Sequence, residues 1–569
     1  MKYQKLAELY EKVSGTTKRL EKTDILSKFL KELSIEDKEV MYLLLGDIYP
    51  EYDERRIGIS NQLAIKAISK ATGIENKEVV KKWKKIGDIG EVAEELTKKK
   101  KQSTLQFQTN TTKKVIENLR KLPELIGAGT VNKKIALITE LLTFATPLES
   151  KYLTRTLIGD LRIGIQESTI RDSIAKAFFE KEEDSQDKVQ RAIDRSNDIS
   201  EVFEIAKKGE IKNLDKIKLE VGKPIKAMLA QKALTIEEGF KALGTPCVVE
   251  YKYDGFRLLI HKKNKKVSLF TRRLENVTKQ FPEVAEYIEK YIEGDSFIFD
   301  SEAVGFDKKT KKYTDFQAIS QRIRRKYNIE KLQKDLPVEI NIFDVLFYNG
   351  KSLLDEPFKT RSELIRKVVK NHPYKIISAK QIITSDAKVA EKFYKEALAN
   401  NQEGIMMKKI DAEYKPGRRV GHMLKVKPDE RDLDLVITGA EYGTGKRRGW
   451  FSSFILSCKK GHEYLEIGKV GTGIKEKSEL GISFEELTNL IKPLITKEKG
   501  KIVEITPKII VAVHYQDLQK SPNYNSGYAL RFPRITALRT HDKPLSEINT
   551  LEEIKEGFES QKKENYQYG

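Results

Sequence analysis

The sequence has little of several features that define common protein classes. Its 569 residues include only two cysteines, Cys247 and Cys458, which cannot form a disulfide framework or a cysteine-rich zinc site. No hydrophobic run approaches the length of a membrane span, and the first residues lack the apolar core of a signal peptide. There is no Gly-x-x-x-x-Gly-Lys-Ser/Thr pattern, which argues against a P-loop ATPase. These absences predict an intracellular, cytoplasmic protein without a membrane anchor.

Acidic residues are outnumbered by basic ones. Lysine and arginine total 106 against 85 aspartates and glutamates, for a net charge of +21 and a pI near 9.3. This excess favours a polyanionic partner, because each neutralised phosphate releases counterions. A lysine-rich proteome would give the same composition, so charge alone leaves both explanations open.

The composition and hydrophobic pattern divide the chain into three parts. Residues 1–220 contain only three of the sixteen prolines and show helical periodicity, as in residues 135–142 and 170–178, which predicts an all-α domain. Residues 221–428 alternate strands, such as 247–260 and 339–348, with helices at 313–326 and 387–399, which predicts an α+β domain on antiparallel sheet. Residues 429–569 carry short strands with glycine turns, which predict a small β-barrel. The expected barrel strands are 435–438, 454–457, 464–467 and 503–505.

The most informative segment is Glu250-Tyr-Lys-Tyr-Asp-Gly-Phe-Arg257, which lies in an apolar stretch (residues 247–260). The pattern predicts a strand, a tight turn at the Asp-Gly pair and a second strand. Because side chains alternate along a strand, Glu250, Lys252 and Asp254 share one face. An amine placed there is a candidate covalent nucleophile if nearby cations and burial keep it neutral. A lysine in a salt bridge on an exposed hairpin is the alternative.

This octet resembles the nucleotidyl-transfer motif of the covalent nucleotidyltransferases, which include DNA ligases, RNA ligases and mRNA capping enzymes. Other segments resemble the remaining motifs of that family in the same order: residues 270–275, 297–304, 341–350, 403–408, 423–427, 531–534 and 539–543. Residues 222–230 resemble the opening of the catalytic domain, and residues 42–50 and 155–165 resemble the helical DNA-binding domain of ATP-dependent DNA ligases. The details are most similar to the archaeal and eukaryotic type.

The resemblance implies an enzyme that seals nicks in duplex DNA during replication, repair and recombination, with ATP and Mg²⁺ as cofactors. In that family a lysine attacks the α-phosphate of ATP, AMP passes to the 5′-phosphate of the nick, and the 3′-hydroxyl then displaces AMP. The implied domains are a helical DNA-binding domain (1–220), an adenylation domain (221–428) and an OB-fold domain (429–569).

The resemblance also implies a role for individual residues, with Lys252 as the nucleophile. The implied nucleotide-binding residues are Glu250, Arg257, Arg272, Glu302, Phe343, Lys408, Arg419, Lys425 and Lys427. The lysines supply a cationic field, the arginines suit phosphate or ribose oxygens, Phe343 stacks on the base, and Glu250 reads its edge. Glu302 and Glu403 are candidate ligands of Mg²⁺, which needs only one or two carboxylates besides substrate phosphates.

Several of these assignments have alternatives. Phe343 lies among apolar neighbours, so the pattern by itself favours a plain core position, and only the resemblance favours stacking on the base. Arg419 is chosen because it lies six residues before Lys425, and Arg418 beside it is a competitor. Glu302 could hydrogen-bond the ribose in place of holding a metal.

Two motifs depart from the family pattern. Met423 stands where the ligases usually carry tryptophan, and we expect this to change packing without changing the chemistry. The segment from Arg539 to Lys543 is one residue longer than the usual Arg-x-Asp-Lys, which leaves the roles of both residues open.

Two further contacts with partners are suggested. The segment containing Gln102, Leu105 and Phe107 resembles a degenerate sliding-clamp-binding peptide, and a polar loop with two apolar residues is the alternative. Gly159 and Gly164 would let the backbone approach a DNA phosphate, although they could be ordinary helix-terminating glycines. We expect the protein to be a monomer.

Three functions compete on the sequence. An ATP-dependent DNA ligase accounts for every motif. An RNA ligase or capping enzyme would not need the helical N-terminal part, and an NAD-dependent ligase would need zinc cysteines that are missing. A non-enzymatic DNA-binding protein would not need Lys252, Lys408 and Lys425 together with paired carboxylates.

Overall fold

A computed structural model describes residues 1–100, 109–127, 129–314, 319, 322–323, 325, 327–428, 432–476, 482–540 and 543–567. The chain forms two compact units, one of Met1–Ala390 with Ile405–Val426 and one of Glu391–Gly404 with Lys427–Gly569. No helix of the described residues is long and apolar enough to cross a membrane. The predicted domain boundaries at residues 220 and 428 stay predictions.

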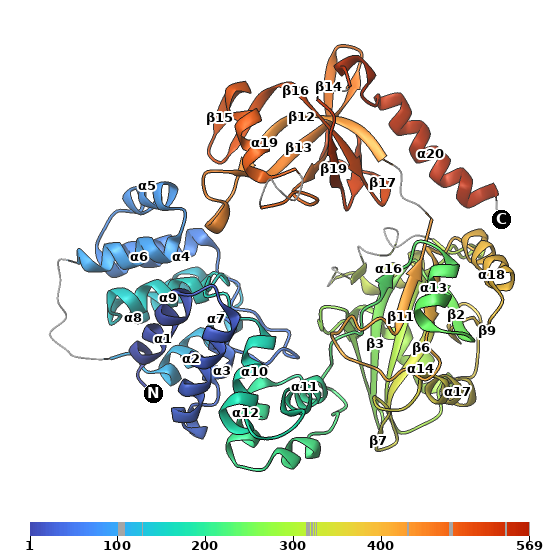
Figure 1. The fold of residues 1–569 in the computed structure, drawn as a ribbon, viewed down its shortest axis with the longest axis horizontal. Helices are drawn as coiled ribbons and strands as arrows, with labels where there is room; N and C mark the ends of the chain where they lie inside the picture. The colour runs from blue at the N-terminus through green and yellow to red at the C-terminus, as the bar shows by residue number, and fades with distance from the viewer. Residues whose placement is uncertain are drawn as a thin grey trace. The chain divides into compact units, whose positions relative to one another are not determined.

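The first part of the first unit is helical (Figure 1, blue to cyan). Its helices are α1 (Tyr3–Ser14), α2 (Arg19–Glu32), α3 (Val40–Leu44), α4 (Asn61–Thr72), α5 (Asn76–Ile86), α6 (Ile89–Lys98), α7 (Thr112–Glu124), α8 (Thr130–Thr143), α9 (Pro147–Leu157), α10 (Glu167–Phe178), α11 (Ser185–Ser196) and α12 (Ile199–Lys207). Ile135, Ile138, Leu141 and Leu142 are buried on α8, as the periodicity predicted. Among the described residues up to Lys216 there is no strand, which confirms the all-α prediction.

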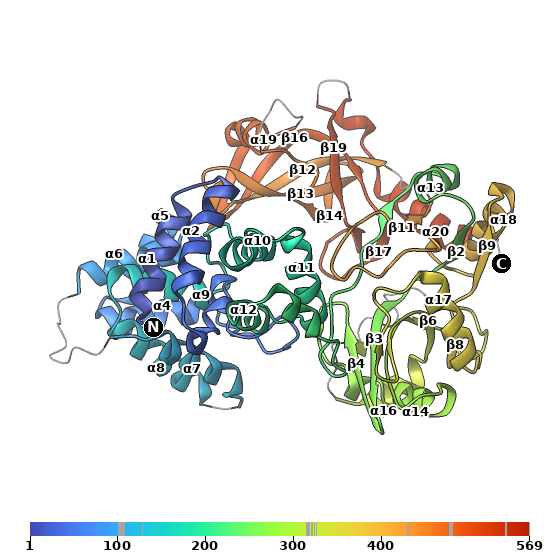
Figure 2. The same cartoon turned by 60° about the horizontal axis from the view of Figure 1, so that its bottom comes forward.

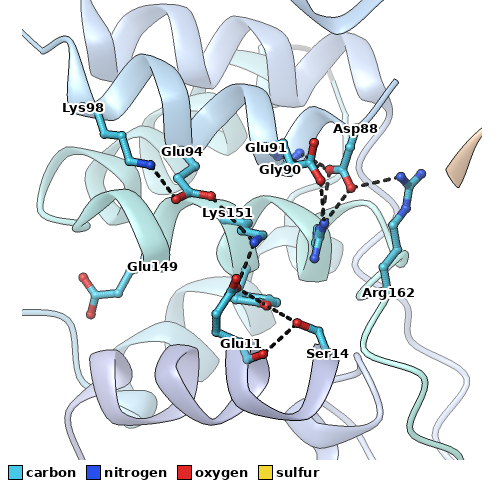
Figure 3. A network of polar contacts seen from close by, with 12 residues as sticks. Glu11, Ser14, Asp88, Gly90, Glu91, Glu94, Lys98, Glu149, Lys151 and Arg162 are labelled. Atoms are coloured by element: carbon cyan, nitrogen blue, oxygen red, sulfur yellow. Dashed lines mark hydrogen bonds and ion pairs between the residues drawn. The ribbon is translucent and has the colours of Figure 1, made fainter. Parts of the chain in front are cut away.

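A buried polar network ties α6 to α9 and to the segment that follows α9 (Figure 3). Asp88 caps the N-terminus of α6 by accepting from the backbone N–H groups of Gly90 and Glu91 at 2.7 and 3.2 Å. The same carboxylate accepts from NH2 of Arg155 on α9 at 2.7 Å and from NH1 of Arg162 at 2.9 Å. Burial raises the pKa of Asp88, but these donors outweigh burial and hold it below its usual range.

The central part of the chain contains two sheets and the helices that cover them (Figure 1, green to yellow). Its strands are β1 (Gln231–Lys232), β2 (Cys247–Lys252), β3 (Phe256–Lys263), β4 (Lys266–Thr271), β5 (Ser296–Gly305), β6 (Val338–Tyr348), β7 (Lys351–Ser352), β8 (Ile376–Ser378), β9 (Gln381–Thr384), β10 (Gly404–Lys408) and β11 (Met423–Val426). Its helices are α13 (Ile236–Leu243), α14 (Pro282–Tyr291), α16 (Ile329–Asp335), α17 (Phe358–Val368) and α18 (Ala387–Ala399). The helix expected at 313–326 falls largely outside the described residues.

One sheet has the order β1-β11-β10-β2-β9, and the other has β4-β3-β5-β6-β7 with β8 beside β6. Figure 2 shows β2, β9 and β11 in one layer, with β3 and β6 in the other. The predicted strand, turn and strand around Lys252 are confirmed, but β2 and β3 belong to different sheets. They therefore do not form the exposed hairpin that was the alternative to a reactive site.

The last part of the chain, in the second unit, is built on a curved antiparallel sheet (Figure 1, orange to red). Its elements are β12 (Asp432–Tyr442), β13 (Phe451–Lys460), β14 (Glu463–Val470), α19 (Phe484–Ile491), β15 (Ile495–Lys499), β16 (Ile502–His514), β17 (Asp517–Lys520), β18 (Tyr528–Arg531), β19 (Arg534–Leu538) and α20 (Leu551–Gln567). The sheet order is β14-β13-β12-β16-β15 with β19 beside β16, and β17 pairs with β18. The four strands expected in this region lie within β12, β13, β14 and β16.

The network around Asp88 predicts a stability difference between two aspartate variants. We expect Asp88→Ala to lower the free energy of unfolding by about 3–5 kcal/mol, because it leaves Arg155 buried without its counter-charge and removes a helix cap. Asp24→Ala is the control, because Asp24 pairs with Lys176 at an exposed position and should change stability by less than about 1 kcal/mol. Urea unfolding of both variants measures the difference.

The same network predicts a pH dependence. Because the folded-state pKa of Asp88 is depressed, its contribution is present above the unfolded-state value of about 3.9 and is lost as pH falls through the folded-state value. The stability gap between the wild type and Asp88→Asn should therefore shrink in acid. A gap that stayed constant below pH 4 would contradict this explanation.

Candidate functional site

The residues of the predicted site are carried by strands of both central sheets. Glu250 and Lys252 lie two positions apart on β2, and hence on one face of it. Lys408 ends the neighbouring strand β10, where it is in register with Met423 of β11. Lys425 lies further along β11 and is half-buried.

The turn between β2 and β3 explains why the motif needs glycine. A Cβ at Gly255 would lie 2.3 Å from the carbonyl oxygen of Ala303 and 3.0 Å from its carbonyl carbon. Backbone at that distance cannot give way, so only glycine lets the chain cross from one sheet to the other against β5. Lys252 and Arg257 are thereby held on different sheets but close in sequence.

A buried ion pair joins β2 and β10. Nζ of Lys408 lies 2.5 Å from Oε2 of Glu250, and both side chains are less than a tenth exposed. Burial raises the pKa of Glu250, although Lys408 opposes that shift. The pair fixes both side chains, because a charge removed from water at this depth requires a partner.

Phe343 of β6 connects the two sheets. Lys408 donates to its carbonyl oxygen at 3.3 Å and lies 4.9 Å from the centre of its ring. The guanidinium of Arg257 lies 5.3 Å from the same ring. Phe343 is half-buried whereas Ile342 is fully buried.

Arg257 is held by a carboxylate and a phenol. Its Nε donates to Oδ1 of Asp300 at 2.7 Å, and its NH2 group donates to Oδ2 of Asp300 and, at 2.8 Å, to the hydroxyl of Tyr414. Burial lowers the pKa of Arg257, but Asp300 outweighs it and keeps the group charged. Glu302, two positions along β5 from Asp300, is half-buried and lies opposite Arg257 in the β3–β5 register.

The other predicted residues lie at the ends of strands or in exposed turns. Arg272 directly follows β4 and is exposed, and Arg419 is exposed ahead of β11. Arg418 is half-buried, and its Nε lies 3.5 Å from Oδ2 of Asp194 on α11. The ion pair occupies Arg418, which favours Arg419 as the residue available to a ligand.

Glu403 and Lys427 flank this sheet in the sequence. Glu403 immediately precedes β10 and Lys427 immediately follows β11, and both are half-buried. Gln102, Leu105 and Phe107 of the expected clamp peptide lie outside the described residues. Arg539 and Lys543 of the last motif both approach Asp434 on β12, at 3.9 and 2.5 Å.

Sequence reasoning missed several residues that build the site. Tyr414 bonds to both Arg257 and Asp300, and its only signal was an aromatic residue ahead of a glycine turn. Arg361 of α17 donates to Asp344, the residue after Phe343, at 2.7 and 3.1 Å. Arg361 lies in helical phase with the buried Phe358 and Ile365 of α17, and this spacing is the signal that could have placed it on the buried face. Met423 is buried in the cluster that includes Tyr414, and the expected effect of the tryptophan replacement on packing stays a prediction.

The carboxylates of the predicted site can hold a metal ion only if a bound ligand or water supplies further ligands. Among the described residues there is no group of three or more histidine, cysteine, aspartate or glutamate side chains that could hold a metal ion. A half-buried carboxylate such as Glu302 can supply one hard oxygen ligand, and the remainder must come from a ligand or water.

Comparisons with known proteins match along the whole chain. Three family models fit: "DNA ligase N terminus" over residues 2–175, "ATP dependent DNA ligase domain" over 227–427 and "ATP dependent DNA ligase C terminal region" over 447–543. The DNA ligases of Nanoarchaeum equitans and Thermococcus onnurineus are 44% and 40% identical over 566 residues, covering 99% of each chain. The solved structure "Pmar-Lig_PreS3" shares the fold with a TM-score of 0.58 at 18% identity, over 94% of this chain and 99% of that one.

The buried pair between Glu250 and Lys408 predicts a second stability difference. We expect Lys408→Met to lower the free energy of unfolding by about 3–5 kcal/mol at neutral pH, because Glu250 stays buried without a counter-charge. Lys409→Met is the control, because Lys409 is exposed and lies 3.5 Å from an exposed aspartate, Asp411.

The deficit of Lys408→Met should shrink as pH falls. Removing the lysine raises the pKa of Glu250 further, so a proton can neutralise the carboxylate in mild acid. Denaturant unfolding at a series of pH values measures the effect. A deficit that is equal at pH 7 and pH 5 would mean that Glu250 is not the group left unpaired.

Proposed function

The chain belongs to the ATP-dependent DNA ligase family, and from that premise we propose that Lys252 is the nucleophile that carries AMP. Its amine attacks the α-phosphate of ATP, a phosphoramide bond forms, and pyrophosphate leaves. The AMP then passes to the 5′-phosphate of a nick and frees the lysine. The 3′-hydroxyl finally attacks that phosphate, a phosphodiester bond forms, and AMP leaves.

The nucleotide is proposed to bind between the two central sheets. The single observation that carries this proposal is the contact of Phe343 with Lys408 from one sheet and Arg257 from the other. We propose that Phe343 stacks on the adenine and that Glu250 reads its edge. Contacts formed before the substrate arrives cost no reorganisation at the moment of reaction.

The remaining cations are proposed to bind phosphate and ribose. Lys408, Lys425 and Lys427 supply positive charge beside the transferred phosphate, as a reaction that develops charge on phosphate oxygens requires. Arg272 and Arg419 are exposed, so their guanidinium groups are accessible to ligand oxygens.

Magnesium is proposed as the metal, with Glu302 and Glu403 as its protein ligands. The absence of a three-ligand cluster among the described residues is compatible with this, because Mg²⁺ takes most of its ligands from water and substrate phosphates. When bound, it would neutralise charge on the phosphate oxygens.

The substrate is proposed to be nicked duplex DNA, held by three domains of residues 1–220, 221–428 and 429–569. The third is proposed to be an OB fold, which the order and antiparallel pairing of its strands support. In the first domain, the segment Asp160–Ile163 is proposed to contact the DNA backbone. Lys22 of α2 donates to the carbonyl oxygens of Ile163 and Gly164, and Arg162 pairs with Asp88, so this segment is fixed before DNA arrives.

Other partner assignments rest on the sequence alone. We propose that the protein acts inside the cell as a monomer in replication, repair and recombination. The clamp peptide with Gln102, Leu105 and Phe107 is kept as a proposed contact with a sliding clamp.

Self-adenylylation tests the central proposal. The protein, first stripped of bound AMP with pyrophosphate, is incubated with Mg²⁺ and ATP labelled in the α-phosphate. We expect covalent label on the wild type and complete loss of label in Lys252→Ala, because the attacking amine is gone. Lys263→Ala is the matched control, since Lys263 is an exposed lysine at the end of the next strand and should label normally.

The outcomes separate the competing functions. Label on Lys252→Ala would refute the assigned nucleophile, and label from GTP alone would indicate a capping enzyme. Sealing of a nicked DNA duplex but not a nicked RNA duplex would separate a DNA ligase from an RNA ligase.

A further inference from the structure

The hydroxyl of Tyr414 is a junction between four segments of the chain. It donates to Oδ2 of Asp300 at 2.9 Å, and it accepts from NH2 of Arg257 at 2.8 Å and from the backbone N–H of Met228 at 3.1 Å. The side chain is only 3% exposed. Strands β3 and β5, the segment ahead of β1 and the segment ahead of β11 therefore meet at one oxygen atom.

The hydrogen bonds at this junction limit how many N–H donors of Arg257 are left for a ligand. A guanidinium has five N–H donors. Arg257 makes four hydrogen bonds within the protein, two to Asp300, one to Tyr414 and one to the carbonyl oxygen of Met228 at 3.3 Å. One N–H at most is left for a ligand, so the main effect of the bonds is to fix the plane of the guanidinium beside Phe343.

The same tyrosine anchors the segment that leads into β11. Its backbone N–H donates to the carbonyl oxygen of Leu354 at 2.8 Å. Four residues later, the carbonyl oxygen of Arg418 accepts from the backbone N–H of Leu229 at 2.9 Å. The exposed Arg419 follows directly, so the hydroxyl connects Arg257 to the segment that carries a second proposed nucleotide contact.

We propose that Tyr414 is a positioning residue for nucleotide transfer, whose hydroxyl fixes the guanidinium of Arg257 against Phe343. The inference rests on the proposed function, in which Phe343 and Arg257 border the bound AMP. A phenol suits the position because one oxygen accepts from the arginine and donates to the aspartate at once. Phenylalanine would keep the ring in the same core and lose all three hydrogen bonds of the hydroxyl.

The first test is Tyr414→Phe in the self-adenylylation assay. We expect kcat/KM for ATP to fall about tenfold, the size of one lost hydrogen bond, with the larger part of the change in KM. Tyr152→Phe is the matched control, because Tyr152 is a fully buried tyrosine whose hydroxyl bonds to Glu11 at 2.7 Å in the helical part. The control should leave both kinetic constants unchanged.

A double-mutant cycle separates positioning from a general loss of stability. Arg257→Lys keeps the charge but cannot form the guanidinium fork. If the hydroxyl acts through that fork, adding Tyr414→Phe to Arg257→Lys should change kcat/KM by less than about twofold. Independent effects would multiply, and that result would overturn the proposal.

Two further outcomes are distinguishable. If Lys252→Ala is unlabelled while Tyr414→Phe has wild-type constants, this inference fails and the proposed function stands. If Lys252→Ala is labelled, the proposed function itself fails. If Tyr414→Phe unfolds below the assay temperature, the cycle is run at a lower temperature at which all four proteins are folded, and the same non-additivity with Arg257→Lys is expected.

Discussion

The close passage of Gly255 against Ala303 is the constraint on which the site depends. It is the point where the chain leaves one sheet and enters the other, and there is no room for a side chain. Because the crossing takes only three residues after Lys252, Lys252 and Arg257 stay close in sequence while belonging to different sheets. A longer or bulkier connection would separate the two central sheets that Phe343 connects.

Buried ion pairs hold the elements of these two sheets in place. Glu250 bonds to Lys408, Asp300 to Arg257 and Asp344 to Arg361, and each pair links two different elements. Such pairs contribute little net stability, because removing two charges from water costs about as much as their attraction returns. Their value here is geometric, since each fixes a side chain that would otherwise have many rotamers.

The basic residues named for the site fall into two groups, fixed and exposed. Lys408 and Arg257 are immobilised by carboxylates and by contact with Phe343, whereas Arg272 and Arg419 lie at exposed positions. The fixed cations define the shape of the proposed nucleotide site, and the exposed ones can move to meet a substrate. Arg418 is paired with Asp194 and is not among the proposed nucleotide contacts.

Much of the fold and part of the site could be predicted from the sequence. Local patterns sufficed for the helical character of the first part, for β2 and β3, and for four strands of the last part, because hydrophobic periodicity is a local property. The motif order sufficed for the family and for Lys252 as the candidate nucleophile. The domain boundaries, the barrel closure and the residue roles are still predictions.

Only the tertiary structure decided which of these residues touch. Phe343 contacts Lys408 and Arg257, and Arg418 pairs with Asp194, and in each case the partner is distant in the chain. There was no sign in the sequence that Tyr414 would bond to Asp300 across 114 positions, or that β2 and β3 would part into two sheets. Residue types and their order therefore determined the chemistry that this chain can perform, and packing between distant segments decided the geometry, because contacts of that kind leave no periodic trace in the sequence.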